Sequence, residues 1–209
     1  MIVSYDTTTY DFASLLQTAY NMDLQKVHTL SNNSGLADKW HIHSLFYSSP
    51  QKDQFMSLYS SFVQNVIVPT YTDESAVYVQ TEPQIQLSLP GSTALEKRAT
   101  DFDDLVGVHI DSVIGQRVLN TGDNYLLALT DMFGTNTIFV EEDGQFRGID
   151  INVGQYYTFQ GKTIRHANKV NATGLTRISI DFRVIRGSQR GDADVDLSFS
   201  TKYDVPKIL

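Results

Sequence analysis

The chain has 209 residues, 41% hydrophobic and 11% aromatic, which is the composition of a globular protein able to bury its own core. It contains no cysteine, which excludes disulfides, thiolate metal sites and cysteine nucleophiles. Its net charge of −8 disfavours a nucleic-acid partner, because such binding depends on basic side chains that neutralise phosphates.

The N-terminal sequence has no basic stretch followed by an apolar one, so we expect no signal peptide. No apolar run approaches the roughly eighteen residues that a membrane span needs. We therefore expect a cytoplasmic protein without membrane contact, as a monomer or homodimer that acts on a small molecule.

The first third of the chain has helical periodicity. Residues 10–24 and 49–67 place apolar side chains about one turn apart, which predicts two helices with one buried face each. A stripe of this kind is more typical of core packing than of a groove for a partner.

From about residue 76 the pattern changes to a period of two. Eight short segments are rich in β-branched and aromatic residues, and turn signals such as Pro90-Gly91 and Asp143-Gly144 separate them. This pattern predicts a mainly β fold with N-terminal helices, either a jelly-roll or a small barrel. The predicted strands are 76–81, 84–89, 105–110, 124–130, 136–142, 148–153, 156–160 and 176–185.

The sequence shows no internal repeat and no linker. We expect one domain over 1–209, with helical support over about 1–75, a β core over about 76–187 and a polar C-terminal tail.

Three residues of the β region form a candidate metal site. His109 and Asp111 are two apart in a strand and therefore project to the same face. His166 is the best-placed third ligand among the remaining histidines. Two histidines and one carboxylate form a facial triad that leaves coordination positions open and favours non-haem Fe(II) used with O2. The alternative is a set of polar strand residues with ordinary hydrogen bonds.

The segment 176–185 carries charge on one face. Alternation puts Arg177, Ser179, Asp181 and Arg183 together, which is costly unless this face lines a wet or ligand-filled cavity. The turn at 171–174 would fold the segment back beside His166. Arg177 would then clamp a carboxylate near the metal, with the hydroxyl of Ser179 as a further donor.

These motifs together resemble the Fe(II)/2-oxoglutarate-dependent oxygenases. The resemblance implies a double-stranded β-helix, a jelly-roll of the cupin-like type. It also implies that His109, Asp111 and His166 bind Fe(II), while Arg177 and Ser179 hold the distal carboxylate of 2-oxoglutarate.

Over roughly residues 80–187 the sequence is most similar to the StrG-like branch of streptomycin biosynthesis, in stretches such as 108–111, 127–141 and 165–185. The resemblance implies a dioxygenase that uses 2-oxoglutarate and O2, in natural-product biosynthesis. The carboxylate of Asp111 favours hydroxylation or desaturation over halogenation. We expect a small polar substrate, such as an amino acid, a guanidino compound or an aminocyclitol.

Four further residues are candidates for the site. Asn124 either hydrogen-bonds the cosubstrate or a side chain that supports the metal ligands, or is a turn residue without a role in the site. Arg183 either binds a substrate carboxylate or pairs with Asp181. Trp40 and Gln116 are candidate substrate contacts, and Gln116 lies where the sequence departs from the StrG-like pattern. Two other functions stay open: a cupin-like metal enzyme that does not use 2-oxoglutarate, and a noncatalytic jelly-roll binding module.

Overall fold

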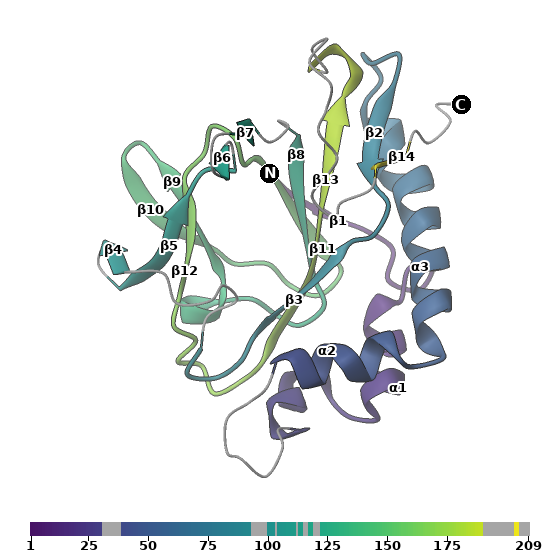
Figure 1. The fold of residues 1–209 in the computed structure, drawn as a ribbon, viewed down its shortest axis with the longest axis vertical. Helices are drawn as coiled ribbons and strands as arrows, with labels where there is room; N and C mark the ends of the chain where they lie inside the picture. The colour runs from purple at the N-terminus through teal and green to yellow at the C-terminus, as the bar shows by residue number, and fades with distance from the viewer. Residues whose placement is uncertain are drawn as a thin grey trace.

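A computed structural model describes residues 1–30, 39–92, 100–102, 104–111, 113–114, 117–118, 122–189 and 203–204. Its helices precede nearly all of its strands (Figure 1). The α-helices are α1 (Phe12–Tyr20), α2 (Lys39–Tyr47) and α3 (Gln51–Phe62). Short turns of 3-10 helix cover Leu24–Leu30, Val68–Thr70, Gly134–Asn136 and Gly187–Gln189, and a π-helical turn, Val63–Ile67, extends α3.

The larger sheet has seven strands in the order β1-β11-β8-β13-β2-β14, with β3 also paired to β13. The pairs β8–β11, β3–β13 and β8–β13 of this sheet are antiparallel. The strands are β1 (Ile2–Ser4), β2 (Val77–Gln80), β3 (Gln84–Ser88), β8 (Asp123–Ala128), β11 (Gln155–Gln160), β13 (Arg177–Arg186) and β14 (Tyr203–Asp204).

The smaller sheet has five strands in the order β10-β9-β12-β5-β4. It consists of β4 (Thr100–Phe102), β5 (Leu105–His109), β9 (Ile138–Glu142), β10 (Gln145–Ile149) and β12 (His166–Lys169). Asp143 and Gly144 join β9 to β10 with positive φ angles of 52° and 76°, as the Asp-Gly signal predicts for a two-residue hairpin. A separate pair is formed by β6 (Val113–Ile114) and β7 (Arg117–Val118).

The order of the strands defines the fold. Along the chain, β3, β8, β11 and β13 belong to the larger sheet, and β5, β9, β10 and β12 belong to the smaller one. Apart from the β9–β10 hairpin, each connection between these eight strands crosses from one sheet to the other. This is a double-stranded β-helix, so the jelly-roll prediction is confirmed.

Two apolar cores hold the layers together. The first lies between the helices and the outer face of the larger sheet, where Tyr59 of α3 meets the ring of Phe182 at 5.3 Å. The second lies between the two sheets and includes Leu126, Val140 and Phe159. The helices thus cover one face of the larger sheet and leave its other face for the interior of the jelly-roll (Figure 1).

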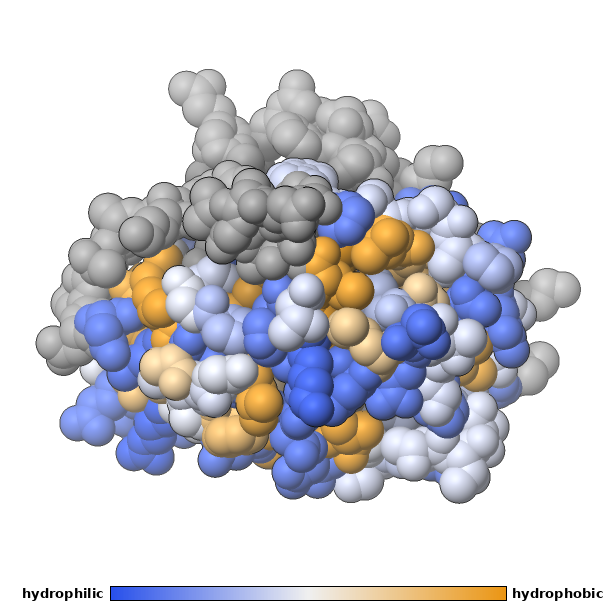
Figure 2. Space-filling view, turned by 90° about the horizontal axis from the view of Figure 1, so that it is seen from below, coloured by the Kyte–Doolittle hydropathy of each residue, from blue (hydrophilic) through white to orange (hydrophobic). Residues whose placement is uncertain are grey.

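The surface seen from below, where α1 and α2 lie, mixes hydrophilic and apolar residues without separating them into two regions (Figure 2). Among the described residues, no helix has the length and apolar character of a membrane-spanning helix.

Candidate metal and carboxylate site

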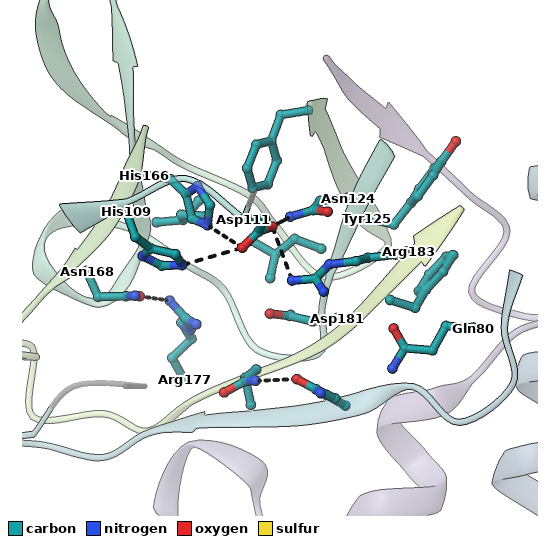
Figure 3. Close-up of a pocket in the computed structure, with 16 residues that line it drawn as sticks. Gln80, His109, Asp111, Asn124, Tyr125, His166, Asn168, Arg177, Asp181 and Arg183 are labelled. Carbon is teal, nitrogen blue, oxygen red and sulfur yellow. Dashed lines mark hydrogen bonds and ion pairs between the residues drawn. The ribbon is translucent and has the colours of Figure 1, made fainter. Parts of the chain in front are cut away.

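A cavity of about 150 Å³ lies between the two sheets, and every predicted metal ligand lines it. Figure 3 shows the two histidines and Asp111 together, with Arg177 below His109 and next to Asn168. Polar and charged residues make up most of the wall: Gln80, Gln84, Gln86, His109, Asp111, Asn124, His166, Asn168, Arg177, Asp181 and Arg183.

The two histidines meet because their strands pair. His109 ends β5 and His166 begins β12, and the register of the two strands places them directly opposite each other. Side chains on one face at such a position lie within contact distance, and the two ring centroids are 4.2 Å apart. Sequence spacing could not show this contact, since 57 positions separate the two residues.

Hydrogen bonds set the tautomer of both rings. The Nδ1 atom of His109 lies 2.6 Å from the carbonyl oxygen of Gly107, and that of His166 lies 3.1 Å from the carbonyl oxygen of Ile164. A carbonyl oxygen only accepts, so each Nδ1 carries the proton and each Nε2 keeps its lone pair for a metal. Burial also lowers the pKa of His166, which favours the neutral form that binds metals.

Asp111 completes the triad. Its Oδ1 atom lies 3.5 Å from Nε2 of His109 and 3.8 Å from Nε2 of His166, and the three ligand atoms all lie within 4.8 Å of one another. Burial opposes ionisation of Asp111, but His109, Arg183, His166 and Asn124 outweigh it and hold its pKa well below the usual range. The group is therefore a carboxylate, as a metal ligand must be.

The second oxygen of Asp111 is occupied from the larger sheet. Arg183 and Asn124 are cross-strand neighbours on β13 and β8, and both point at this carboxylate. Nη2 of Arg183 lies 3.2 Å from Oδ2, and Nδ2 of Asn124 donates a hydrogen bond to the same atom (Figure 3). Arg183 thus pairs with Asp111, a partner that neither sequence alternative named. With Oδ2 engaged, Oδ1 is the atom left to face the histidines.

Gly161 allows this approach. Its carbonyl oxygen accepts a hydrogen bond from the backbone N–H of Asp111 at 2.8 Å. A Cβ atom added to Gly161 would collide with the Asp111 carboxylate and the Asn124 amide. Any other residue here would displace the Asp111 carboxylate, a constraint that the sequence did not reveal.

Arg177 lies in the same cavity and is buried, with 3% of its surface exposed. Nη1 donates to Oδ1 of Asn168 at 3.0 Å and to the backbone carbonyl of Asn136 at 3.3 Å. Among the described residues, Nε is buried and has no hydrogen-bond partner. No carboxylate of these residues lies within 4.0 Å of the guanidinium nitrogens. Burial lowers the pKa of Arg177, but arginine stays charged, so the cavity holds a cation that lacks a full set of acceptors.

Ser179 and Asp181 are linked to each other. The fully buried hydroxyl of Ser179 donates to Oδ1 of Asp181 at 3.1 Å, and Ser179 does not line the cavity. Burial raises the pKa of Asp181 to about 6, although Arg177, Ser179 and Arg183 oppose the shift. Asp181 lies between Arg177 and Arg183 in Figure 3 and adds an acidic group to the wall.

The two remaining candidates have different outcomes. Trp40 lies on α2 with 77% of its surface exposed, and it is not among the residues that line the cavity. Gln116 and most of the polar tail lie outside the described residues. Sequence reasoning missed Asn168 and the three glutamines. Asn168 follows His166 by two residues, so strand alternation would have placed it on the same face.

The arrangement can hold a divalent metal on three side chains from one end, with an anion bound to Arg177 at the other. Such a site leaves metal positions open for small ligands.

No protein-family model matches the chain. Streptomycin biosynthesis protein StrG from Streptomyces griseus is 30% identical over 148 residues. This alignment covers 65% of the present chain and 65% of StrG. Membership of a StrG-like branch stays a prediction.

Two solved structures are also similar. The non-heme monooxygenase ThoJ in complex with nickel aligns with 88% of this chain and 73% of its own, at 15% identity and a TM-score of 0.46. A prolyl hydroxylase from Trichoplax adhaerens, in complex with a hypoxia inducible factor peptide, aligns with 91% of this chain and 84% of its own. Its identity is 10% and its TM-score 0.46.

Proposed function

We propose that this protein is an Fe(II)- and 2-oxoglutarate-dependent oxygenase that acts as a single domain on a small polar metabolite. The observation that carries the proposal is the charged, buried guanidinium of Arg177, which shares one cavity with a preformed His-Asp-His cluster. A metal site alone suits many enzymes. A metal site paired with a built carboxylate receptor suits an oxygenase with an acidic cosubstrate.

The donor set fits Fe(II). His109 and His166 present Nε2, and Asp111 presents one carboxylate oxygen. Imidazole and carboxylate ligands both suit Fe(II), and three ligands on one side leave room for a chelating cosubstrate and O2. Arg183 and Asn124 keep Asp111 in position through its other oxygen.

The guanidinium fits the distal carboxylate of 2-oxoglutarate. Burying a charged group is costly. The nearby Asp181 carboxylate attracts Arg177 but accepts no hydrogen bond from it, so the unpaired donor of this buried cation is explained by a ligand that pairs with it. Arginine is the side chain best shaped to bind a carboxylate through two parallel hydrogen bonds.

When bound, iron and 2-oxoglutarate supply the oxidising chemistry, in which O2 is consumed, the cosubstrate becomes succinate and CO2, and a substrate C–H bond is hydroxylated or desaturated. The protein binds and orients these reactants. Leu126, Ile138 and Phe159 line part of the wall with apolar side chains, which limits the water near the reacting groups.

Other residues of the cavity wall support a polar substrate. Gln84 and Asp181 are cross-strand neighbours, and Gln86 donates to Gln84 at 3.2 Å. Together with Gln80 they offer amide donors, amide acceptors and a carboxylate, which suit hydroxyl or amino groups. Similarity to the streptomycin biosynthesis protein StrG supports a setting in natural-product biosynthesis.

The deciding experiment is anaerobic titration of the protein with Fe(II) and then 2-oxoglutarate, followed by visible absorption. We expect a charge-transfer band that requires both additions. The His166→Ala variant should lose Fe(II) binding, whereas Arg177→Met should bind Fe(II) and form the band only at much higher 2-oxoglutarate concentration. Under air, wild-type protein should then release succinate.

Each alternative gives a different result. Fe(II) binding without any response to 2-oxoglutarate would indicate a cupin-like metal enzyme of another class. The absence of Fe(II) binding by wild-type protein would contradict the proposal and favour a noncatalytic binding module.

A further inference from the structure

Asn168 lies at the junction between the metal cluster and the anion site. It is on β12, two residues after His166, and both side chains line the cavity. The Oδ1 atom of Asn168 accepts a hydrogen bond from Nη1 of Arg177 at 3.0 Å (Figure 3). One short strand therefore carries a candidate metal ligand and a partner of the buried guanidinium.

The hydrogen bonds of Arg177 divide its five donors into two groups. Nη1 has two N–H bonds and two acceptors, which are the Asn168 side chain and the Asn136 carbonyl oxygen at 3.3 Å. Nε is buried and has no partner among the described residues. The Nη1 side is thus occupied by protein, and the Nε–Nη2 edge is the one left to pair with a carboxylate.

Both acceptors on Nη1 are held by the fold. The Asn136 carbonyl belongs to a short 3-10 turn, and the side chain of the same residue accepts a hydrogen bond from the backbone N–H of Phe133 at 2.7 Å. Asn168 lies in register with Val106 on one side and Ile138 on the other. A guanidinium held at one nitrogen by two fixed acceptors cannot turn its plane freely.

We infer that Asn168 is a positioning residue that fixes the plane of Arg177 so that its Nε–Nη2 edge binds the distal carboxylate of a 2-oxo dicarboxylate. This inference rests on the proposed function, because it assigns a role in binding 2-oxoglutarate. Its consequence is selectivity: β12 sets both the metal ligand His166 and the orientation of the carboxylate receptor. A 2-oxo acid without a distal carboxylate gains nothing from Asn168.

The test compares two probes on Zn(II)-loaded protein, 2-oxoglutarate and pyruvate, by isothermal titration calorimetry. Pyruvate has the same metal-chelating 2-oxo acid end but no distal carboxylate. In Asn168→Leu, which keeps the approximate volume and removes the acceptor, we expect 2-oxoglutarate to bind about 10-fold more weakly. Zn(II) and pyruvate should bind as they do to wild type.

Two further variants keep the result interpretable. Asn168→Ala removes the same acceptor with less crowding if the leucine variant does not fold. Asn171→Ala is the matched control, since Asn171 is also buried and hydrogen-bonded, to the carbonyl oxygens of Ser88 and Leu175, but does not line the cavity. It should leave the preference for 2-oxoglutarate over pyruvate unchanged.

The outcomes separate this inference from the proposed function. If wild-type protein shows no preference for 2-oxoglutarate over pyruvate, the proposed cosubstrate is wrong. If wild type shows the preference and both Asn168 variants keep it, only the role of Asn168 is wrong. A parallel loss of Zn(II) or pyruvate binding would also overturn the inference, because it would show that the substitution distorts β12.

Discussion

The two faces of β13 have opposite character. The inner face carries Arg177, Asp181 and Arg183, which line the cavity. The outer face is apolar and packs against the helices, as Phe182 shows by meeting the ring of Tyr59 of α3 at 5.3 Å, although Phe182 also borders the cavity. Adjacent residues along one strand therefore serve a polar site and an apolar core in turn.

This difference shows how the fold supports a charged interior. A row of ionisable groups inside a jelly-roll would be expensive without compensation. Arg183 pairs with Asp111, and Asp181 accepts a hydrogen bond from Ser179. Burial of the outer face against the helices stabilises the same strand from behind. We expect substitutions on the two faces to affect different properties of the protein.

The largest effect should come from the outer face. Phe182 is 2% exposed and contacts Tyr59 and Tyr125, so Phe182→Ala leaves a cavity in the helix–sheet core. We expect the free energy of unfolding to fall by about 3–5 kcal/mol, measured by chemical denaturation of the metal-free protein. Phe182→Leu, the milder control, should lose less.

In the same Phe182→Ala protein, Zn(II) affinity at a temperature where it is fully folded should stay near that of wild type. A strong loss of affinity would contradict the separation of the two faces, because it would show that the apolar core determines the metal geometry directly.

An intermediate effect should come from Arg183 on the inner face. Arg183→Leu removes the cation that holds Oδ2 of Asp111, and partners of metal ligands typically contribute about 10–100-fold to metal affinity. We expect Zn(II) to bind more weakly within that range, as measured with a competing chelator. Arg186→Leu is the matched control, because Arg186 also pairs with a carboxylate, that of Asp123, but does not line the cavity. Equal losses in both variants would contradict a specific role for Arg183.

The sequence predicted the long apolar elements and the alternation of β13 correctly. Residues 176–185 alternate so regularly that both faces could be assigned, and the stripes at Phe12 and Phe55 mark helices that the structure contains. These predictions succeed because burial imposes a period on the sequence.

The sequence named His166 as a candidate ligand but did not predict β12 or the contact of Asn168 with Arg177. Of the four residues of β12, His166 and Asn168 are polar because they line the cavity, and Lys169 pairs with Asp104, so no apolar alternation marks the segment as a strand. The partner of Arg183 was missed for a similar reason. Contact with Asp111 requires the two sheets to be stacked, and strand periodicity describes only one sheet at a time.

The last effect concerns the charge of Asp181 on the inner face. Burial raises the pKa of Asp181 to about 6 from a usual value of 3.8, so ionising this group costs the folded protein stability. The sign follows from proton binding: between these two values the folded state holds more protons than the unfolded state, and stability falls as pH rises. Above pH 6 the cost is complete and constant.

Asp181→Asn removes this cost and nearly keeps the shape of the side chain. We expect the variant to gain stability relative to wild type as pH rises from about 4 to 6, with a constant advantage at higher pH, in urea denaturation of the metal-free proteins. A stability difference between the two proteins that does not change with pH would show that burial does not raise the pKa of Asp181. Methylammonium that enters the cavity and pairs with the ionised Asp181 carboxylate of the wild type should reduce this advantage. Such a result would indicate that Asp181 is accessible to an amino group of a substrate.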